Sequence, residues 1–167
     1  MGKRRGEGRG RALALAMAAT ATLADQLSKR AALAQLAEPP RTIELTPFLN
    51  LTLGFNRGVS FGLFSSSADL GWLLILMALA IVACLLVWAW YARGRAMQLA
   101  LGAIIGGAIS NVIDRVRQGA VTDFMDLHAF GWHWPTFNLA DVFIVCGVAA
   151  LLVLGWRDQG AARSAHR

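Results

Sequence analysis

The sequence predicts an all-α membrane protein with four transmembrane helices and a small extracytoplasmic β element. Three observations lead to this prediction. Apolar residues make up 56% of the 167 residues and charged residues 16%, with a mean hydropathy of +0.51. Four stretches are long and apolar enough to form helices across a bilayer, and one connection between them alternates apolar and polar residues. A single soluble domain of this length cannot bury so much apolar surface, so the chain is expected to be one integral membrane domain over residues 1–167.

The predicted spans cover residues 12–30, 70–92, 96–113 and 138–156. The second has no charged residue between Asp69 and Arg93, and the third has none between Arg95 and Asp114. At about 1.5 Å of rise per residue, each of these two covers a hydrocarbon core of roughly 30 Å, the third span only just. The fourth contains one acid, Asp141, near its start.

The first stretch fits two interpretations. A basic start, an apolar run over 12–24 and small residues at 19–24 are also typical of a cleavable signal peptide. The pattern continues through Asp25 to Leu33 without a turn residue, and cleavage would leave three spans in place of four. We therefore expect a transmembrane helix.

Lysine and arginine residues predict the orientation. They cluster before residue 12, between the second and third spans, and after residue 156, and an even number of spans places these three regions on one side. By the positive-inside rule that side is cytoplasmic, so both termini are expected inside. The net charge of +6 thus indicates topology and not nucleic-acid binding, because no basic stripe is interleaved with aromatic residues.

The longer connections, residues 31–69 and 115–137, are expected on the outer side. Within the first, Leu49, Leu51, Leu53 and Phe55 alternate with polar or small residues, the period of a half-buried strand. A similar alternation begins at 43–45. We expect a small β element on the membrane surface.

Polar residues that are costly at membrane depth cluster at one end of the predicted spans. Asp25 and Lys29 lie near the end of the first span, and Asn138 and Asp141 open the fourth. The end of the third span and the loop after it supply the other members, Asn111, Asp114, Arg115 and Asp123. In the predicted topology all of these ends meet at the outer face, which indicates a common site.

Two carboxylates brought together at such a face can share one proton and activate a water molecule for hydrolysis. Other chemistry lacks support in the sequence. Serine and cysteine residues have no neighbouring histidine base, Cys84 and Cys146 lie in apolar runs, and His128 and His133 lack a third ligand at metal spacing. We therefore expect neither a metal nor a cofactor.

Structural roles remain open for the same residues. Asp25 and Lys29, four apart, fit an intrahelical ion pair as well as a role in positioning substrate. Asn138 fits an N-cap, with Asp141 at the N3 position, where the helix dipole favours its ionised form and hence a role as base, leaving Asp123 as the acid. Asp126 and His128 are expected to be solvated loop residues. On residue chemistry alone, a channel subunit or a structural membrane protein competes with an aspartyl enzyme.

Four motifs, in order along the chain, resemble those of the lipoprotein signal peptidases, also called type II signal peptidases. They are Asp25-Gln-Leu-Ser-Lys29, Phe55-Asn-Arg-Gly-Val-Ser-Phe-Gly62, Gly106-Gly-Ala-Ile-Ser-Asn-Val-Ile-Asp-Arg115 continuing to Val121-Thr-Asp-Phe124, and Phe137-Asn-Leu-Ala-Asp-Val142. Each motif is short, but the ordered set on four spans is highly specific.

The resemblance implies a four-helix membrane aspartyl endopeptidase with a β-cradle and an extracytoplasmic active site. Such an enzyme removes signal peptides from bacterial prolipoproteins before the diacylglyceryl-modified cysteine of the lipobox, in contact with membrane lipids, and is inhibited by the cyclic peptide globomycin. We expect this chain to act as a monomer. The resemblance implies that Asp123 and Asp141 are catalytic. It implies supporting roles for Asp25, Lys29, Asn56, Asn111, Asp114, Arg115 and Asn138.

The chain departs from the family pattern by small substitutions at a few positions. Val59-Ser60 replaces the usual Ala-Ala, Ser110 stands where Gly is common, and Thr122 replaces a Val. These differences bear on fine substrate preference. Asp114 is a second candidate partner for Asp141, but the adjacent Arg115 suits it to a salt-bridged structural role, so Asp123 is preferred.

Overall fold

The structure, a computed structural model, describes the backbone of residues 2–58 and 68–165 and, within it, the side chains of 8, 10–58 and 71–157. The outer-loop motif residues 59–62 lie outside the described residues, and so do most basic side chains of the two tails, those of Lys3, Arg4, Arg5, Arg9, Arg163 and Arg167. Along the chain the elements are α1 (Gly2–Leu36), β1 (Ile43–Thr46), β2 (Leu49–Asn56), α2 (Ala68–Tyr91), α3 (Arg95–Gln118), β3 (Val121–Ala129), β4 (Trp132–His133) and α4 (Leu139–Ala165).

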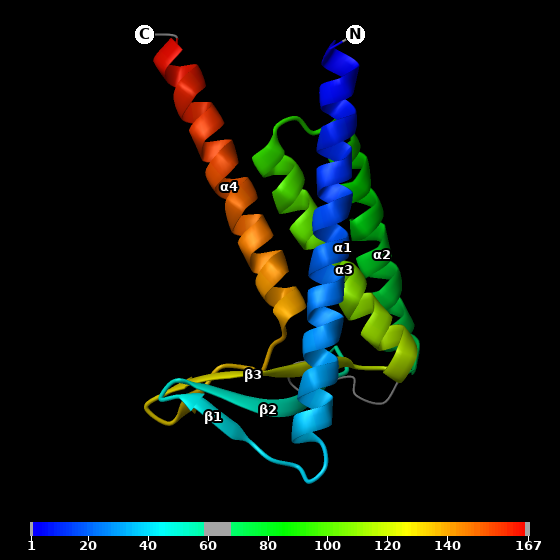
Figure 1. Cartoon of the computed structure of the whole chain (residues 1–167), viewed down its shortest axis with the longest axis vertical. Helices are drawn as coiled ribbons and strands as arrows, with labels where there is room; N and C mark the ends of the chain where they lie inside the picture. The colour runs from blue at the N-terminus through cyan, green and yellow to red at the C-terminus, as the bar shows by residue number, and fades with distance from the viewer. Residues whose placement is uncertain (1, 59–67, 166–167) are drawn as a thin grey trace.

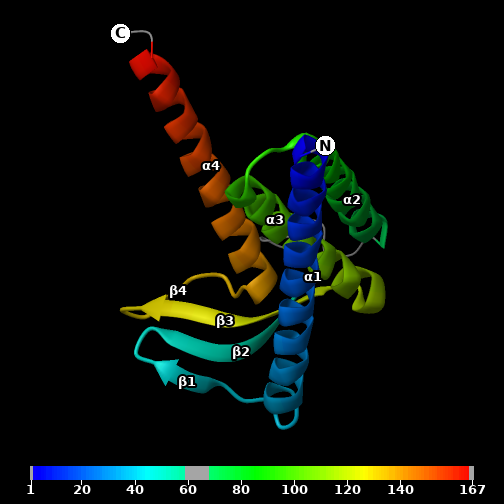
Figure 2. The same cartoon turned by 45° about the horizontal axis from the view of Figure 1, so that its top comes forward.

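Figure 1 shows the helices roughly parallel to the long axis, with the sheet across one end and both chain termini at the other. Helix α3 contacts α1, α2 and α4, so it is the centre of the helical part. The view in Figure 2 shows α4 leaning away from the others toward its C-terminus. The fold is therefore a helical body with a small sheet attached where α1 ends and α4 begins.

Among the described residues, three helices have the length and apolar composition to cross a membrane: α2 over Gly71–Tyr91, α3 over Arg95–Gln118 and α4 over Leu139–Arg157. They coincide with three of the four predicted spans and have the length and composition that a span needs. Helix α1 is continuous across residues 12–30, but it is not among the three. Its apolar run is mostly alanine and ends at Asp25, with Gln26 and Lys29 in the next turn. The fourth span stays a prediction.

Glycines let α3 approach its neighbours closely. A Cβ on Gly106 would lie 2.3 Å from the carbonyl oxygen of Ala18 in α1, and a Cβ on Gly107 would lie 2.5 Å from that of Ala140 in α4. Backbones this close leave no room for a side chain, so the two adjacent glycines of the motif serve opposite faces of α3. The contact with α4 is close to the first turn that contains Asp141, so it helps to position that residue.

The sheet has the strand order β1-β2-β3-β4 and all its pairs are antiparallel. The two strands predicted from alternation, β1 and β2, are confirmed. Strand β3 was not predicted, and Asp123 lies on it instead of in a loop. Helix α3 runs to Gln118, one turn beyond the predicted end, and stops at Gly119, whose φ of 73° provides a left-handed C-cap and whose N–H donates to Arg115.

The prediction that Asp126 and His128 are solvated loop residues is wrong. Both lie on β3, and Asp126 is buried. Its carboxylate accepts from Asn50 Nδ2 at 3.3 Å on the paired strand and contacts His133 Nδ1 at 2.9 Å on β4. The hydrogen bond with His133 lowers the pKa of Asp126 below its ordinary value. Sheet pairing, which brings Asn50 opposite Asp126, explains the burial of this acid.

Replacing Gly106 with Ala should destabilise the protein by about 1–3 kcal/mol, because the added methyl group has no space against α1. Gly155→Ala in α4 is the matched control, since nothing lies within 4 Å of its Cβ position, and its effect should be near zero or stabilising. Thermal unfolding in detergent measures both. Equal midpoints for the two variants would contradict the close packing of α1 on α3.

Candidate active site

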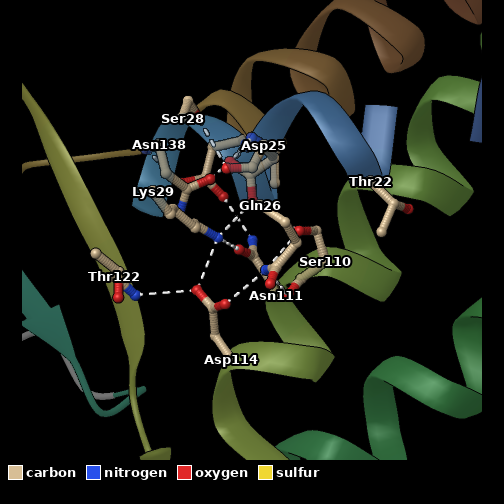
Figure 3. Close-up of polar contacts among 12 residues, drawn as sticks. Thr22, Asp25, Gln26, Ser28, Lys29, Ser110, Asn111, Asp114, Thr122 and Asn138 are labelled. Atoms are coloured by element: carbon tan, nitrogen blue, oxygen red, sulfur yellow. Dashed lines mark hydrogen bonds and ion pairs between the residues drawn. The ribbon is translucent and has the colours of Figure 1, made fainter. Parts of the chain in front are cut away.

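The predicted site residues do meet, at the end of the helical body that faces the sheet. Helix α1 contributes Asp25 and Lys29, and α3 contributes Asn111 and Asp114. Asp123 comes from β3, Asn138 from the residue before α4, and Asp141 from its first turn. Figure 3 shows the part of the cluster around Lys29, whose side chain points from α1 toward Asn111 and Asp114. The convergence predicted from the topology is confirmed by these contacts.

Asn138 and Asp141 form a reciprocal cap at the start of α4. The backbone N–H of Asp141 donates to Asn138 Oδ1 at 3.0 Å, and the backbone N–H of Asn138 donates to Asp141 Oδ2 at 3.2 Å. This is the geometry of a capping box with Asn and Asp in place of the more common pair. The predicted N-cap is confirmed, and it fixes one oxygen of Asp141 at the helix N-terminus.

Two side-chain amides connect the two candidate catalytic acids. Asn138 Nδ2 donates to Asp123 Oδ1 at 2.6 Å and lies 3.3 Å from Asn111 Oδ1. Asn111 Nδ2 donates to Asp141 Oδ1 at 3.0 Å. Both carboxylates are therefore held by amide donors of the same short chain of hydrogen bonds, although they lie 18 residues apart on different elements.

The two acids differ in environment. Asp123 is 2% exposed on β3, whereas Asp141 is partly exposed at the helix terminus. Burial raises the pKa of Asp123 from its ordinary value of 3.8 to about 6. The hydrogen bond from Asn138 opposes this rise, while the negative charge of Asp141 adds to it. A buried acid that holds its proton up to about pH 6 beside a capped carboxylate is an arrangement suited to acid–base chemistry.

The Lys29 ammonium uses all three of its N–H donors within the protein. It contacts Asp25 Oδ2 at 2.6 Å, Asp114 Oδ2 at 2.8 Å and Asn111 Oδ1 at 2.9 Å. Lys29 and Asp25 are 3% and 0% exposed. A buried ammonium needs such partners, since its desolvation is otherwise very costly. Of the two roles left open for the pair, Lys29 and Asp25 show a structural one that extends beyond their own helix.

The carboxylates of Asp25 and Asp114 also accept hydrogen bonds from groups other than Lys29. Asp25 accepts from the backbone N–H of Ala140 at 2.8 Å in α4 and from Ser110 Oγ at 2.7 Å in α3. Asp114 accepts from the backbone N–H of Thr122 at 3.1 Å in β3 and from Gln26 Nε2 at 2.7 Å in α1. The network around Lys29 therefore joins α1, α3, β3 and α4.

Sequence reasoning did not include Gln26 in the site, although it lies inside the first motif. Its amide also donates to Ser110 Oγ at 3.0 Å. Ser110 and Thr122, two of the departures from the family pattern, are fully buried members of this network. A hydroxyl group at a position that is usually apolar is the sequence signal for such a network, since a buried hydroxyl requires a partner. Ser110 joins the network through its hydroxyl group and Thr122 through its backbone N–H.

The expected partner of Asp114 differs in the structure. Asp114 is salt-bridged to Lys29, and no ion pair with Arg115 occurs among the described residues. Arg115 is half-buried and Nη1 lies 3.4 Å from the Asn111 carbonyl oxygen of its own helix. Asn56, at the exposed end of β2, accepts from the Gly58 N–H at 2.8 Å, and its amide is near enough to Asp123 to favour the ionised carboxylate. No group of three metal-ligating side chains occurs in the part of the chain that the structure describes.

Apolar helices, a sheet at one end and paired acids between them define a membrane protein with a site suited to hydrolysis. The comparisons with known proteins identify the family. Residues 17–157 match the profile described as Signal peptidase (SPase) II. The chain therefore belongs to the signal peptidase II family and is a peptidase.

Relatives and solved structures agree with this family. The chain is 48% identical over 131 residues to a lipoprotein signal peptidase of Methylobacterium sp. (strain 4-46), covering 77% of this chain and 79% of the relative. It is 40% identical over 151 residues to that of Polynucleobacter necessarius subsp. necessarius (strain STIR1), covering 86% and 88%. A bacterial membrane enzyme solved at 2.3 Å superposes with a TM-score of 0.73 at 28% identity, covering 87% and 88% of the two chains.

Asp123→Asn should make the protein more stable at pH 8 by up to about 3 kcal/mol, because it removes the cost of ionising a buried acid. The folded-state pKa of about 6 exceeds the ordinary value of 3.8, so this acid favours the fold below about pH 4 and loses that contribution as the pH rises through 6. Unfolding of both proteins in detergent from pH 4 to 8 measures the difference. A difference independent of pH would contradict the raised pKa.

Lys29→Met should destabilise the fold by about 3–5 kcal/mol, because Asp25 and Asp114 would remain buried without a cation. Arg30→Met, an exposed neighbour with the same charge, is the control and should change stability by less than about 0.5 kcal/mol. Adding Asp25→Asn and Asp114→Asn to Lys29→Met should restore part of the loss. If the single and triple variants unfold alike, the charges are not what holds these elements together.

Proposed function

We propose that this chain removes signal peptides from prolipoproteins with Asp123 and Asp141 as a non-covalent aspartyl pair. Membership of the signal peptidase II family supports the substrate class. The observation that carries the residue assignment is the amide chain of Asn138 and Asn111, which binds both acids at once. Supporting positions belong to Asp25, Lys29, Asn56, Asn111, Asp114, Arg115 and Asn138.

In the proposed reaction, the Asp141 carboxylate takes a proton from a water molecule whose oxygen attacks the scissile carbonyl carbon. Asp123, in the protonated form that burial favours up to about pH 6, donates its proton to the carbonyl oxygen. These steps give a tetrahedral diol. As the diol collapses, one of its hydroxyl groups gives its proton to the ionised Asp123, and Asp141 gives its proton to the leaving amine nitrogen. The C–N bond breaks, and the pair regains its starting protonation state. Asn138 and Asn111 hold the acids in place throughout.

The proposed cleavage point precedes the diacylglyceryl-modified cysteine of the lipobox. With the aspartates at the membrane surface, the lipid chains of the substrate extend into the bilayer and hold the peptide bond beside the pair. Both termini lie at the end opposite the sheet (Figure 1), which supports a topology with cytoplasmic termini, four spans and an extracytoplasmic site in a bacterial inner membrane. We further propose that the enzyme acts as a monomer and that globomycin inhibits it.

Asp114 is the alternative partner for Asp141. Its two oxygens already accept from Lys29, the Thr122 N–H and Gln26, and this leaves Asp114 poorly placed to exchange a proton with substrate. Asp123 has a close hydrogen bond from the Asn138 amide and the amide of Asn56 nearby, and no cation contacts its carboxylate among the described residues. The contacts therefore favour Asp123 as the acid.

Asp123→Asn and Asp141→Asn should each lower the rate of cleavage of a lipidated prolipoprotein by about 10²–10⁴-fold, since each removes a proton-transfer group. The gel shift of the processed lipoprotein measures the rate. Asp126→Asn is the matched control, because this acid is buried on the same strand but pairs with His133, and it should retain most activity. Asp114→Asn should retain measurable activity. If Asp123→Asn cleaves while a folded Asp114→Asn does not, Asp114 is the partner of Asp141.

A further inference from the structure

A cavity lies between the N-terminal half of α1 and the C-terminal half of α2, with α3 behind it. Its volume is about 190 Å³, and its wall is almost wholly apolar. The lining includes Ala14, Ala18, Leu86, Ala89, Trp90 and Ile105. An apolar cavity of about 150 Å³ can stay dry and bind a small hydrocarbon, so this one has room for several methylene groups. None of its lining residues belongs to the aspartate site.

One cation, Arg11, lines this apolar cavity. Its Nε donates to the Trp90 carbonyl oxygen at 3.2 Å, and its guanidinium carbon lies 3.8 Å from the centroid of the Trp90 ring. These two contacts hold the guanidinium in place. Its Nη1 and Nη2 groups have no hydrogen-bond partner among the described residues. The cavity therefore combines an apolar interior with a fixed guanidinium whose Nη groups contact no other described residue.

The position of Arg11 along α1 places it at a membrane surface. It precedes Lys29 by 18 residues, about 27 Å of helix, which is close to the thickness of a hydrocarbon core. The aspartate site lies at one surface, so Arg11 lies at the other. The α2–α3 connection lies toward the same end of the molecule as the start of α1 (Figure 1). Arg93 in this connection and Arg95 at the start of α3 are both exposed. In the proposed topology this is the cytoplasmic leaflet, where anionic lipids attract basic residues.

We propose that this cavity binds an anionic phospholipid, with the phosphate on the Nη groups of Arg11 and part of one acyl chain between α1 and α2. A guanidinium presents two parallel donors that match phosphate oxygens. Leu15 and Leu86 at the rim are 61% and 42% exposed, so an acyl chain can enter from the bilayer without displacing a packed side chain. Few residues of α1 contact α2 directly, and the lipid would fill the space that separates them.

Native mass spectrometry of the delipidated protein, titrated with phosphatidylglycerol or phosphatidylcholine in detergent, tests the proposal. Wild type should bind one phosphatidylglycerol per monomer and bind phosphatidylcholine more weakly. Arg11→Gln should raise the apparent Kd for phosphatidylglycerol by about five-fold or more, whereas Arg95→Gln, the same charge change outside the cavity, should not. All variants should still cleave prolipoprotein, which shows that they are folded.

Filling the cavity tests the acyl-chain half of the site. Ala14→Leu should weaken binding of both lipids with Arg11 intact, and Leu86→Trp at the rim serves the same purpose if Ala14→Leu unfolds. Equal effects of Arg11→Gln and Arg95→Gln would show general surface charge and overturn the proposal. The proposal would also be overturned if lipid binding were unchanged after the cavity is filled, or if the two lipids bound with equal affinity. A dimer in place of a monomer with one lipid would overturn it as well.

Discussion

The arrangement of α3, α4 and the sheet around α1 depends on the contacts of the buried Lys29 ammonium group. An ammonium removed from water requires compensating charge and an acceptor for each N–H, and here the acceptors are Asp25, Asp114 and Asn111. Two of these acceptors in turn bind further elements. Asp25 holds the first turn of α4 through Ala140, and Asp114 holds β3 through Thr122. One charge near the end of α1 thereby sets the relative positions of α3, α4 and the sheet.

This network explains how two acids on separate elements come to lie near each other. Asp123 is on β3 and Asp141 is on α4, and Asn138 and Asn111 provide the amide contacts that connect them. Asn111 has its oxygen held by Lys29, so its amide group points to Asp141. The same enclosure that positions Asp123 also deprives it of water and raises its pKa. The position of Asp123 and its raised pKa therefore have the same cause, which is its enclosure by the surrounding elements.

Much of this was accessible from the sequence because it depends on local patterns. The spans 70–92, 96–113 and 138–156, the two alternating strands and the Asn138 cap are each encoded within a few neighbouring residues. Strand β3 was missed because its buried positions include Thr122, Asp123 and Asp126, which break the apolar alternation. The prediction that Arg115 is the ion-pair partner of Asp114 was wrong for a related reason. Lys29 is 85 residues away, and only the packing of α1 on α3 brings it closer than the adjacent Arg115.

Helix α1 illustrates what hydropathy does and does not report. Of the three apolar spans, α3 is the least apolar and the most buried within the protein, whereas α2 and α4 are more apolar and mostly exposed. Among these three helices, the one most buried within the protein therefore has the lowest hydropathy. Helix α1 lies against α3 along much of its length, and its buried face consists of alanines followed by Asp25 and Lys29. A helix whose neighbours satisfy its polar groups needs fewer apolar residues to cross a membrane. The lower hydropathy of α1 is therefore consistent with the proposed four-span topology, in which α1 carries part of the site.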